Sequence, residues 1–180
     1  MLLKIQLPDH DAAIEFNRLR WAEVHSDPQL LRNPNRIETN AWGQIIMTPP
    51  PSSDHSARQT EIVFLLRERL GGRPLVECPI STADGVRAAD VAWCSSDRYS
   101  RVRGQLAFEI APEICVEVAS PGNTKAELTY KQKLYFAAGA IECWTCNTDG
   151  QMTFCHRDSP DTLTASSQLC PDFPHTIPNP

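Results

Sequence analysis

The sequence lacks any long hydrophobic run. No apolar segment reaches the roughly 20 residues that a membrane-spanning helix needs, and no basic-plus-apolar signal segment opens the chain. Membrane-spanning and secreted proteins are therefore not indicated. Since the cysteines also read as free thiols, we expect a cytoplasmic protein with no membrane partner.

The chain has no excess of positive charge. Its 17 Lys and Arg residues stand against 22 Asp and Glu residues, a formal net charge of −5. A protein that coats nucleic acid through a generally basic surface is therefore not indicated. A local basic face is compatible with this total, so a nuclease is not excluded.

The seven cysteines include one CxxC pair, Cys143 and Cys146, but no second pair at matching spacing. The closest partners, Cys155 and His156, lie on the next expected strand, whereas structural zinc sites usually join two such pairs. Strand alternation places Cys143 and Cys146 on opposite faces, which does not suit one tetrahedral ion. We favour buried reduced thiols. A zinc or redox protein remains the alternative.

The 180 residues suit one domain with a sizeable core, which we expect to span residues 1–180, with its core at about 36–156. The order of elements predicts an α/β protein with a mixed sheet flanked by helices. The expected segments are a helix over 9–25, a hairpin over 36–47, a helix over about 55–70, strands over 74–80, 86–94 and 114–119, a helix over about 124–138, and strands over 141–147 and 152–156. The proline-rich tail over 158–180 either packs as an arm or is mobile.

Local signals support several of these boundaries. Ser53 or Asp54 is expected to cap the helix that follows, and Gly139 stands where a helix C-cap glycine belongs. Asp149-Gly150 predicts a type I′ hairpin turn between the last two strands. Scattered arginines follow the strand over 86–94, and we expect them in a loop.

Two carboxylates interrupt the expected buried strands, Asp90 in "AADVAW" and Glu117 in "CVEVAS". An ionised carboxylate in an apolar setting is costly unless it is paired or bound to a metal. Two on adjacent strands would suppress each other's ionisation unless a cation neutralised them. Mg²⁺ is the obvious candidate, because it prefers carboxylate oxygen. The alternative is that each faces solvent on an amphipathic strand.

The helix over 124–138 supplies a cation. Lys131 shares a helical face with Glu127 and Tyr135 at four-residue spacing. Lys133 lies about 200° away around the helix, so only one of the two lysines can face the carboxylates. Ordinary solvation of a helix surface is the alternative for each.

The segments "GVRAADVAW" and "EICVEVASPGNTKAELTYKQKLYFAAGAIECW" resemble the Uma-two family of restriction endonuclease-like proteins, within the PD-(D/E)XK nuclease superfamily. The resemblance extends upstream to "GQIIMTPPP" and to the leucine-rich helix "HSARQTEIVFLLRERL". It covers roughly residues 36–156. The run from Glu117 through Lys131 and Tyr135 to Trp144 is its most specific part.

The resemblance implies a restriction-endonuclease-like αβββαβ core in which Asp90 and Glu117 ligate a divalent ion. In the superfamily signature a lysine follows the glutamate by two residues, and here that position is Ala119. The family pattern places a lysine in the following helix, where it aligns with Lys131. Ala89 also departs from the pattern, which usually has proline before the aspartate.

The resemblance also suggests residues that would complete or border the metal site. A strand carbonyl near Val118 would complete the metal ligands. His55 and Gln59 match the family pattern and share a helical face, so they could border the site, and Glu61 could be a further ligand. Helix surface or capping remains the favoured interpretation for these three. A local basic patch could contact phosphates, and its residues are Arg98, Arg101 and Arg103.

The function that follows is an Mg²⁺-dependent endonuclease, with Mn²⁺ as a substitute ion, that hydrolyses DNA phosphodiester bonds. The ion would polarise the phosphate and activate water, and Lys131 would orient that water or stabilise the developing charge. A homodimer is expected, because two-fold symmetry serves the cutting of both strands. The alternative is a catalytically inactive nucleic-acid-binding or assembly module on the same fold.

Overall fold

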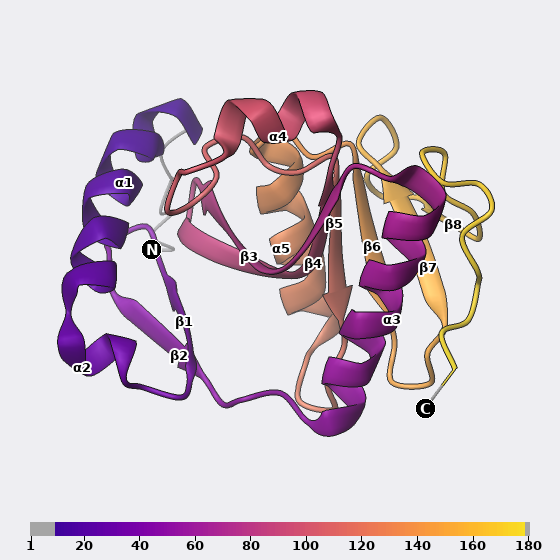
Figure 1. Cartoon of the computed structure of the whole chain (residues 1–180), viewed down its shortest axis with the longest axis horizontal. Helices are drawn as coiled ribbons and strands as arrows, with labels where there is room; N and C mark the ends of the chain where they lie inside the picture. Colours follow the sequence, from indigo (N-terminus) through magenta and orange to yellow (C-terminus); the bar gives the residue numbers. More distant parts are fainter. Residues whose placement is uncertain (1–9, 179–180) are drawn as a thin grey trace, which may run out of the picture.

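A six-stranded mixed sheet crosses the molecule in the order β3-β4-β5-β6-β7-β8, and a separate two-stranded hairpin, β1-β2, lies at one end (Figure 1). The computed structural model describes residues 10–178, with side chains from Ala13 onward. The strands are β1 (Arg36–Thr39), β2 (Ile45–Thr48), β3 (Arg73–Thr82), β4 (Gly85–Cys94), β5 (Ile114–Val118), β6 (Glu142–Cys146), β7 (Met152–His156) and β8 (Leu163–Thr164). The helices are α1 (His10–Ser26), α2 (Pro28–Leu31), α3 (Ser53–Leu70), α4 (Ser96–Val102) and α5 (Lys125–Ala137).

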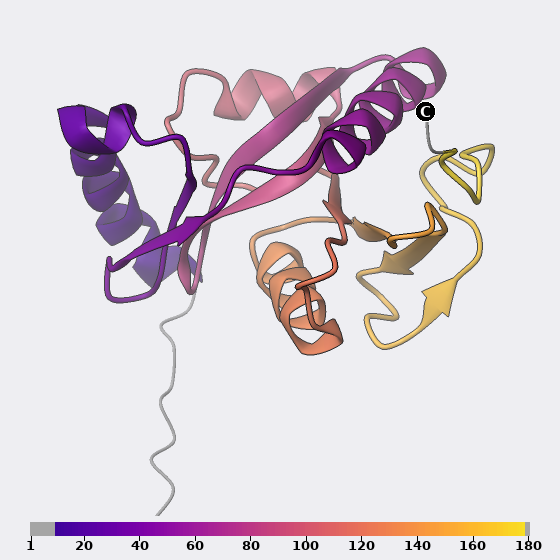
Figure 2. The same ribbon diagram turned by 90° about the horizontal axis from the view of Figure 1, so that it is seen from below.

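Apart from the short helix α4 inserted between β4 and β5, the order α3-β3-β4-β5-α5-β6 is the expected αβββαβ core, so the predicted fold class is confirmed. Strands β5 and β6 are parallel and are joined through α5, whereas the other neighbours in the sheet are antiparallel. Two parallel strands need such a crossover, because a tight turn reverses the chain direction and so joins only antiparallel strands. Helices α3 and α5 lie on opposite faces of the sheet (Figure 2).

Two hydrophobic clusters fill these two faces. One joins Ile62 and Leu66 of α3 to Val91, Val116 and other inward residues of the sheet. The other joins Tyr135 and Ala138 of α5 to the opposite face. Of the CxxC pair, Cys143 belongs to the α5 cluster and Cys146 to the α3 cluster, so strand alternation separates them as expected.

Helix boundaries follow local chemistry. Ser52, rather than Ser53 or Asp54, caps α3 by accepting a hydrogen bond from His55 N–H, which corrects the predicted cap by one residue. Thr124 and Glu127 form a capping box at the start of α5. The segment expected as an arginine-containing loop is instead the helix α4, because Ser95 caps it.

The hairpin between β6 and β7 is present, but its turn is not type I′. A type I′ turn needs positive φ at both central residues. Among the described residues only Glu77 combines a side chain with positive φ, so Asp149 does not meet that condition. Gly150 has a φ of 81° and donates its N–H to Asn147 O, which fits a three-residue loop with glycine at the left-handed position.

The segment after β7 packs as an arm, which decides between the two expectations for the tail. Cys170, Phe173 and Ile177 are buried in the α3 cluster. Met152 N–H donates to His175 O, and Ile177 N–H donates to Gly150 O. A Cβ at Gly150 would collide with the Ile177 carbonyl, so this glycine admits the arm. Residues 179–180 of the expected tail and residue 9 of the expected first helix lie outside the described residues.

Candidate active site

The candidate site forms where β4 loses its neighbour β5. The ladder between these strands pairs Trp93 with Ile114 and ends with Val91 opposite Val116. Asp90 and Glu117 are therefore the next residues across from each other, beyond the last pair. Val118 N–H donates to Asp90 Oδ2 at 2.7 Å. The Asp90 carboxylate thus replaces a missing ladder acceptor and holds the two strands in register at this point.

The first half of β4 is completed by side chains of the β1 hairpin instead of a neighbouring strand. Val86 N–H donates to Thr39 Oγ1 at 2.9 Å, and Ala88 N–H donates to Glu38 Oε1 at 2.7 Å. The carbonyl of Ala88 accepts from Lys131 Nζ at 3.1 Å and from Arg36 Nη2. Buried backbone groups need such partners. Because the backbone of β4 needs these partners, charged side chains from β1 and α5 meet beside Ala88.

Strand β4 changes face at Asp90. Strict alternation would put Ala89 and Val91 on one face of the sheet, yet Ala89 packs in the α5 cluster and Val91 in the α3 cluster. Across β3, the ladder pairs Val76 with Val91 and then Cys78 with Ala89, omitting Glu77. Glu77 has a φ of 49°, a left-handed conformation that is uncommon for a residue with a side chain. This distortion turns Glu77 toward the same space as Asp90.

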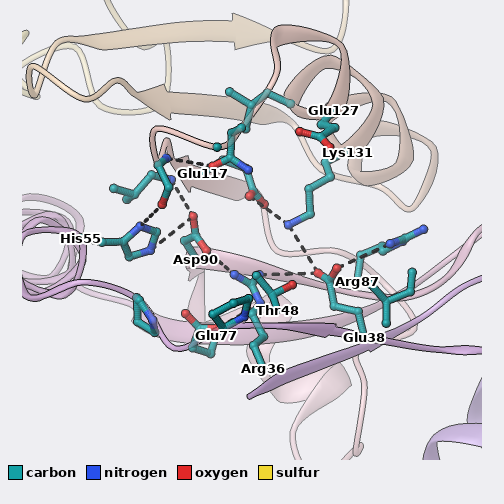
Figure 3. Close-up of a pocket in the computed structure, with 18 of the residues that line it drawn as sticks. Arg36, Glu38, Thr48, His55, Glu77, Arg87, Asp90, Glu117, Glu127 and Lys131 are labelled. Carbon is teal, nitrogen blue, oxygen red and sulfur yellow. Dashed lines mark hydrogen bonds and ion pairs between the residues drawn. The ribbon is translucent and has the colours of Figure 1, made fainter. Parts of the chain in front are cut away.

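Asp90 is buried with a dense set of partners. Arg36 Nη1 donates to its Oδ1, and His55 Nε2 lies 3.7 Å from its Oδ2 (Figure 3). Burial alone would raise the pKa of Asp90, but the nearby His55, Arg36 and Lys131 lower it to about 2. Asp90 is therefore ionised throughout the physiological range.

Glu117 is held by α5. Tyr135 donates its hydroxyl to Oε1 at 2.7 Å, and Lys131 Nζ donates to Oε2 at 2.9 Å. Burial raises the pKa of Glu117 to about 7, and the negative charge of Asp90 acts in the same direction, while Lys131 and Tyr135 oppose it. Without a further cation, Glu117 is therefore poised between its two protonation states near neutral pH.

Lys131 is the α5 lysine that faces the carboxylates. Besides Glu117 it lies 3.4 Å from Glu38 Oε1. Burial acts to lower the pKa of Lys131, but Glu117 and Glu38 together raise it above its ordinary value. The side chain is therefore a fixed positive charge and not a general base. Lys133 is exposed on the opposite side of the helix.

Two of the three accessory residues reach the site. His55 Nδ1 is 3.3 Å from Ser120 Oγ, a contact that orients the ring. Gln59 donates to Glu77 Oε1 at 2.7 Å and to the Asp90 carbonyl at 3.1 Å, so it fixes both residues of the distorted strand pair. His55 and Gln59 are buried, so the favoured helix-surface interpretation is wrong for them. Glu61 does not line the pocket.

Asp90, Glu117, Lys131 and His55 line a pocket of about 640 Å³ between the β1 hairpin and the body of the protein. In Figure 3, Arg36 and Glu38 of β1 and Lys131 of α5 point toward one another across it. Its acidic residues are Glu38, Glu77, Asp90, Glu117 and Glu127, and its basic residues are Arg36, Arg87 and Lys131. Five acidic side chains therefore face three basic ones.

A group with metal-ligand geometry lies inside this pocket. One ligand atom each from His55, Glu77 and Asp90 lie within 4.8 Å of one another. Asp90 thus belongs to this group and also lies across from Glu117 of the adjacent strand β5. Val118, whose carbonyl is the third expected ligand, also lines the pocket. Carboxylate and carbonyl oxygens suit Mg²⁺ and Mn²⁺, and an imidazole ligand shifts the preference toward transition metals.

The phosphate-contacting patch expected at Arg98, Arg101 and Arg103 does not form at this site, because none of the three lines the pocket. The cap at Ser95 folds this segment into α4, with Arg103 as its C-cap residue, instead of leaving it as a loop. Helix α4 begins at Ser96, just after β4 ends (Figure 1). The residues of β4 that line the pocket, Arg87 and Asp90, come earlier in that strand. The expected loop is therefore corrected to a helix, and the structure does not bring these arginines to the carboxylates.

Each of the three arginines has another place in the structure. Arg98 donates to the carbonyls of Ala111 and Gly139 and so ties α4 to the end of α5. Arg101 pairs with Asp97 on the surface of α4. Arg103 is the exposed C-cap residue of α4, and its backbone N–H donates to the carbonyl of Tyr99 at 2.9 Å. These contacts give Arg98 a structural role and leave Arg101 and Arg103 on a surface away from the carboxylates.

Sequence reasoning missed four charged residues of the site, Arg36, Glu38, Glu77 and Arg87. Arg36 and Glu38 share one face of β1 at two-residue spacing, a pattern that any exposed strand also shows. Glu77 interrupts the apolar run "PLVECPI" in the way that Glu117 interrupts its own strand. That interruption was a usable signal for Glu77, whereas nothing local marks Arg36.

Comparison with known proteins agrees with this fold. Residues 21–177 match the model of the Uma2 family, described as "Putative restriction endonuclease". The chain belongs to the Uma2 family. A crystal structure of a protein from Anabaena variabilis, described as "a putative nuclease belonging to DUF820", matches with a TM-score of 0.64 and 20% sequence identity, covering 87% of this chain and 93% of that one.

That structural match supports the fold alone, whereas the family match supports the resemblance seen in the sequence. No curated protein matches the chain significantly. Within the described residues, no helix is long and apolar enough to cross a membrane.

Proposed function

We propose that this Uma2 protein is a divalent-metal-dependent endonuclease that hydrolyses DNA phosphodiester bonds. The observation that carries the proposal is the opposition of Asp90 and Glu117 on adjacent strands, with Lys131 donating to Glu117 at 2.9 Å inside the pocket. The family description and the nuclease-like structural neighbour favour the same chemistry.

The donor set fits a divalent ion. Asp90 is ionised, Glu117 has a pKa raised partly by Asp90, and the pocket has two more acidic than basic residues. A phosphodiester would meet this excess of negative charge as repulsion unless a cation were bound. We assign Asp90, Glu117 and the Val118 carbonyl as the residues that would hold Mg²⁺ or Mn²⁺. Such an ion supplies Lewis-acid polarisation of the phosphate and an activated water.

The remaining residues act on geometry and charge. Lys131 is kept protonated, so its role is to hold Glu117 and to stabilise negative charge that develops on the phosphate. Tyr135 fixes the other oxygen of Glu117. Lys131 takes the part of the lysine that the superfamily signature would place at Ala119, because a charge is needed at a point in space rather than at a position in the sequence.

The direct test measures cleavage of plasmid DNA with Mg²⁺ or Mn²⁺ by Asp90→Asn and Glu117→Gln. Both substitutions remove a ligand charge while conserving shape, and we expect cleavage to be abolished. Glu127→Gln is the matched control, because Glu127 lines the same pocket at its exposed rim, and it should remain active. Retained cleavage in either site variant would contradict the assignment.

An inactive DNA-binding module is separated by electrophoretic mobility of DNA with and without Mg²⁺. Salt-sensitive binding by the wild-type protein without cleavage in any divalent metal would replace the endonuclease with the module.

A further inference from the structure

Arg36 occupies the centre of the carboxylate cluster. Its guanidinium donates to Asp90 Oδ1 and to the Ala88 carbonyl, and it lies 3.1 Å from Glu77 Oε2 and 3.6 Å from Glu38 Oε1. Figure 3 shows this side chain extending from β1 into the space between Asp90, Glu77 and Glu38. One side chain therefore neutralises carboxylates from three strands.

Of the two groups that hold the Asp90 carboxylate most closely, only Arg36 can leave. Val118 N–H, on Oδ2, is part of the backbone of β5. The Arg36 guanidinium, on Oδ1, is the end of a long side chain. Its buried Nε makes no hydrogen bond, although it lies close to Glu77. The Glu77 side chain is 40% exposed, so the guanidinium borders an open route to solvent.

The charge balance favours an exchange of cations. Glu38, Glu77, Asp90 and Glu117 carry four negative charges when ionised, and Arg36, Arg87 and Lys131 carry three positive charges. A divalent ion added beside Arg36 would be repelled by a positive charge that touches the same carboxylate. A divalent ion in place of the guanidinium would add one positive charge and bring the cluster closer to neutral.

We propose that Arg36 is the resident counter-cation of the ion-free site and competes with the divalent ion for Asp90. This inference rests on the proposed metal-dependent function. Binding of the ion releases the guanidinium from Asp90, and the released guanidinium is then available to the phosphate of the substrate. Arg36 thereby also ties the β1 hairpin to β4 in the absence of the ion.

The test is calorimetric titration of the DNA-free protein with Mn²⁺. We expect Arg36→Gln to bind Mn²⁺ at least about tenfold more tightly than the wild type, because the interaction of a single and a double positive charge within a few ångströms reaches that size even in a water-like medium. In EDTA the same variant should unfold at a lower temperature than the wild type, and saturating Mn²⁺ should raise its unfolding temperature by a larger increment.

Arg87→Gln is the matched control. Arg87 lies in the same pocket, but it pairs with Glu38 and Asp84 rather than with Asp90. Its removal changes the pocket charge by the same amount, so an equal gain in Mn²⁺ affinity would overturn competition at Asp90. Unchanged or weaker Mn²⁺ binding by Arg36→Gln would also overturn it.

A second variant guards against misfolding. Arg36→Lys keeps the charge but cannot reach several carboxylates with a planar fork, and we expect an affinity between those of the wild type and Arg36→Gln. Absence of Mn²⁺ binding in the wild type and in every folded variant would instead refute the metal site of the proposed function. The two failures are therefore distinguishable.

Discussion

Asp90 and Glu117 face each other across two strands, yet their pKa values move in opposite directions. Asp90 contacts His55, Arg36 and a backbone N–H, whereas Glu117 relies on Lys131 and a neutral hydroxyl. The pair therefore carries between one and two negative charges near neutral pH. A cation bound between the two carboxylates would favour the ionised form of both.

The raised pKa of Glu117 predicts a loss of stability as pH rises in the absence of metal. The folded protein keeps a proton on Glu117 up to about pH 7, whereas the unfolded chain releases it near 4.5. The contribution of Glu117 to the free energy of unfolding is therefore greatest below pH 4.5. It falls by on the order of 2–3 kcal/mol as the pH rises through the folded pKa.

Glu117→Gln should remove this dependence. We expect the free energy of unfolding in EDTA, measured by urea denaturation, to fall less between pH 5 and pH 8 for the variant than for the wild type. Glu127→Gln should follow the wild type, since the pKa of Glu127 is lowered by its hydrogen bonds with Thr124 and this carboxylate stays ionised in that range. Parallel curves for wild type and Glu117→Gln would contradict the assigned pKa.

The two lysines of α5 provide a matched pair for catalysis. Lys131→Met should reduce the rate of cleavage by about 100- to 1,000-fold, the loss typical of removing one fixed charge or donor at a developing oxyanion. Lys133→Met, on the exposed side of the same helix, should leave cleavage unchanged. Single-turnover cleavage at saturating Mg²⁺ measures both, and equal rates for the two variants would exclude Lys131 from the chemistry.

Elements with a regular pattern were predictable from the sequence. The helix over 53–70 has a cap, an apolar stripe and a terminal glycine, and the αβββαβ order follows from such segments. The face change at Asp90 was not predictable, because period-two alternation is the rule that it breaks. It depends on Glu77 of β3 and on the end of the β4–β5 ladder, which are tertiary features.

The site was predictable in part for the same reason. Asp90, Glu117 and Lys131 lie in segments whose residue pattern resembles a family. Arg36 and Glu38 reach the site only because β1 folds against an unpaired half of β4, some 50 residues along the chain. No local signal encodes that contact.

The arm after β7 is expected to contribute strongly to stability. Phe173 is buried against Trp144, with ring centroids 4.7 Å apart. Phe173→Ala should lower the free energy of unfolding by about 3–5 kcal/mol, the usual cost of emptying a buried aromatic site. Leu163→Ala, on the exposed face of β8, is the control and should change it little. Urea denaturation measures both, and a small effect at Phe173 would show that the arm is not part of the core.

At the scale of the whole molecule, each chain is assigned one candidate site within its described residues. Cutting both strands of a duplex with a single site per chain is served by a two-fold assembly. We therefore expect light scattering to give twice the 20.1 kDa of the chain in solution or when DNA is bound. A monomer under both conditions would contradict the homodimer and would favour nicking of one strand.

One core cluster contains residues from early and late parts of the chain, Ile62 and Val116 together with Phe173 and Ile177. The order in which the chain is synthesised therefore matters for this cluster. A growing chain contains every proposed site residue once Lys131 has been added, but it still lacks the residues of β6, β7 and the arm that belong to the same core cluster. We expect this core cluster to be complete only after Ile177 has been added. We therefore expect a nascent chain of this protein to carry its proposed site residues in an unassembled form, and the assembled site to arise only when this core cluster is complete.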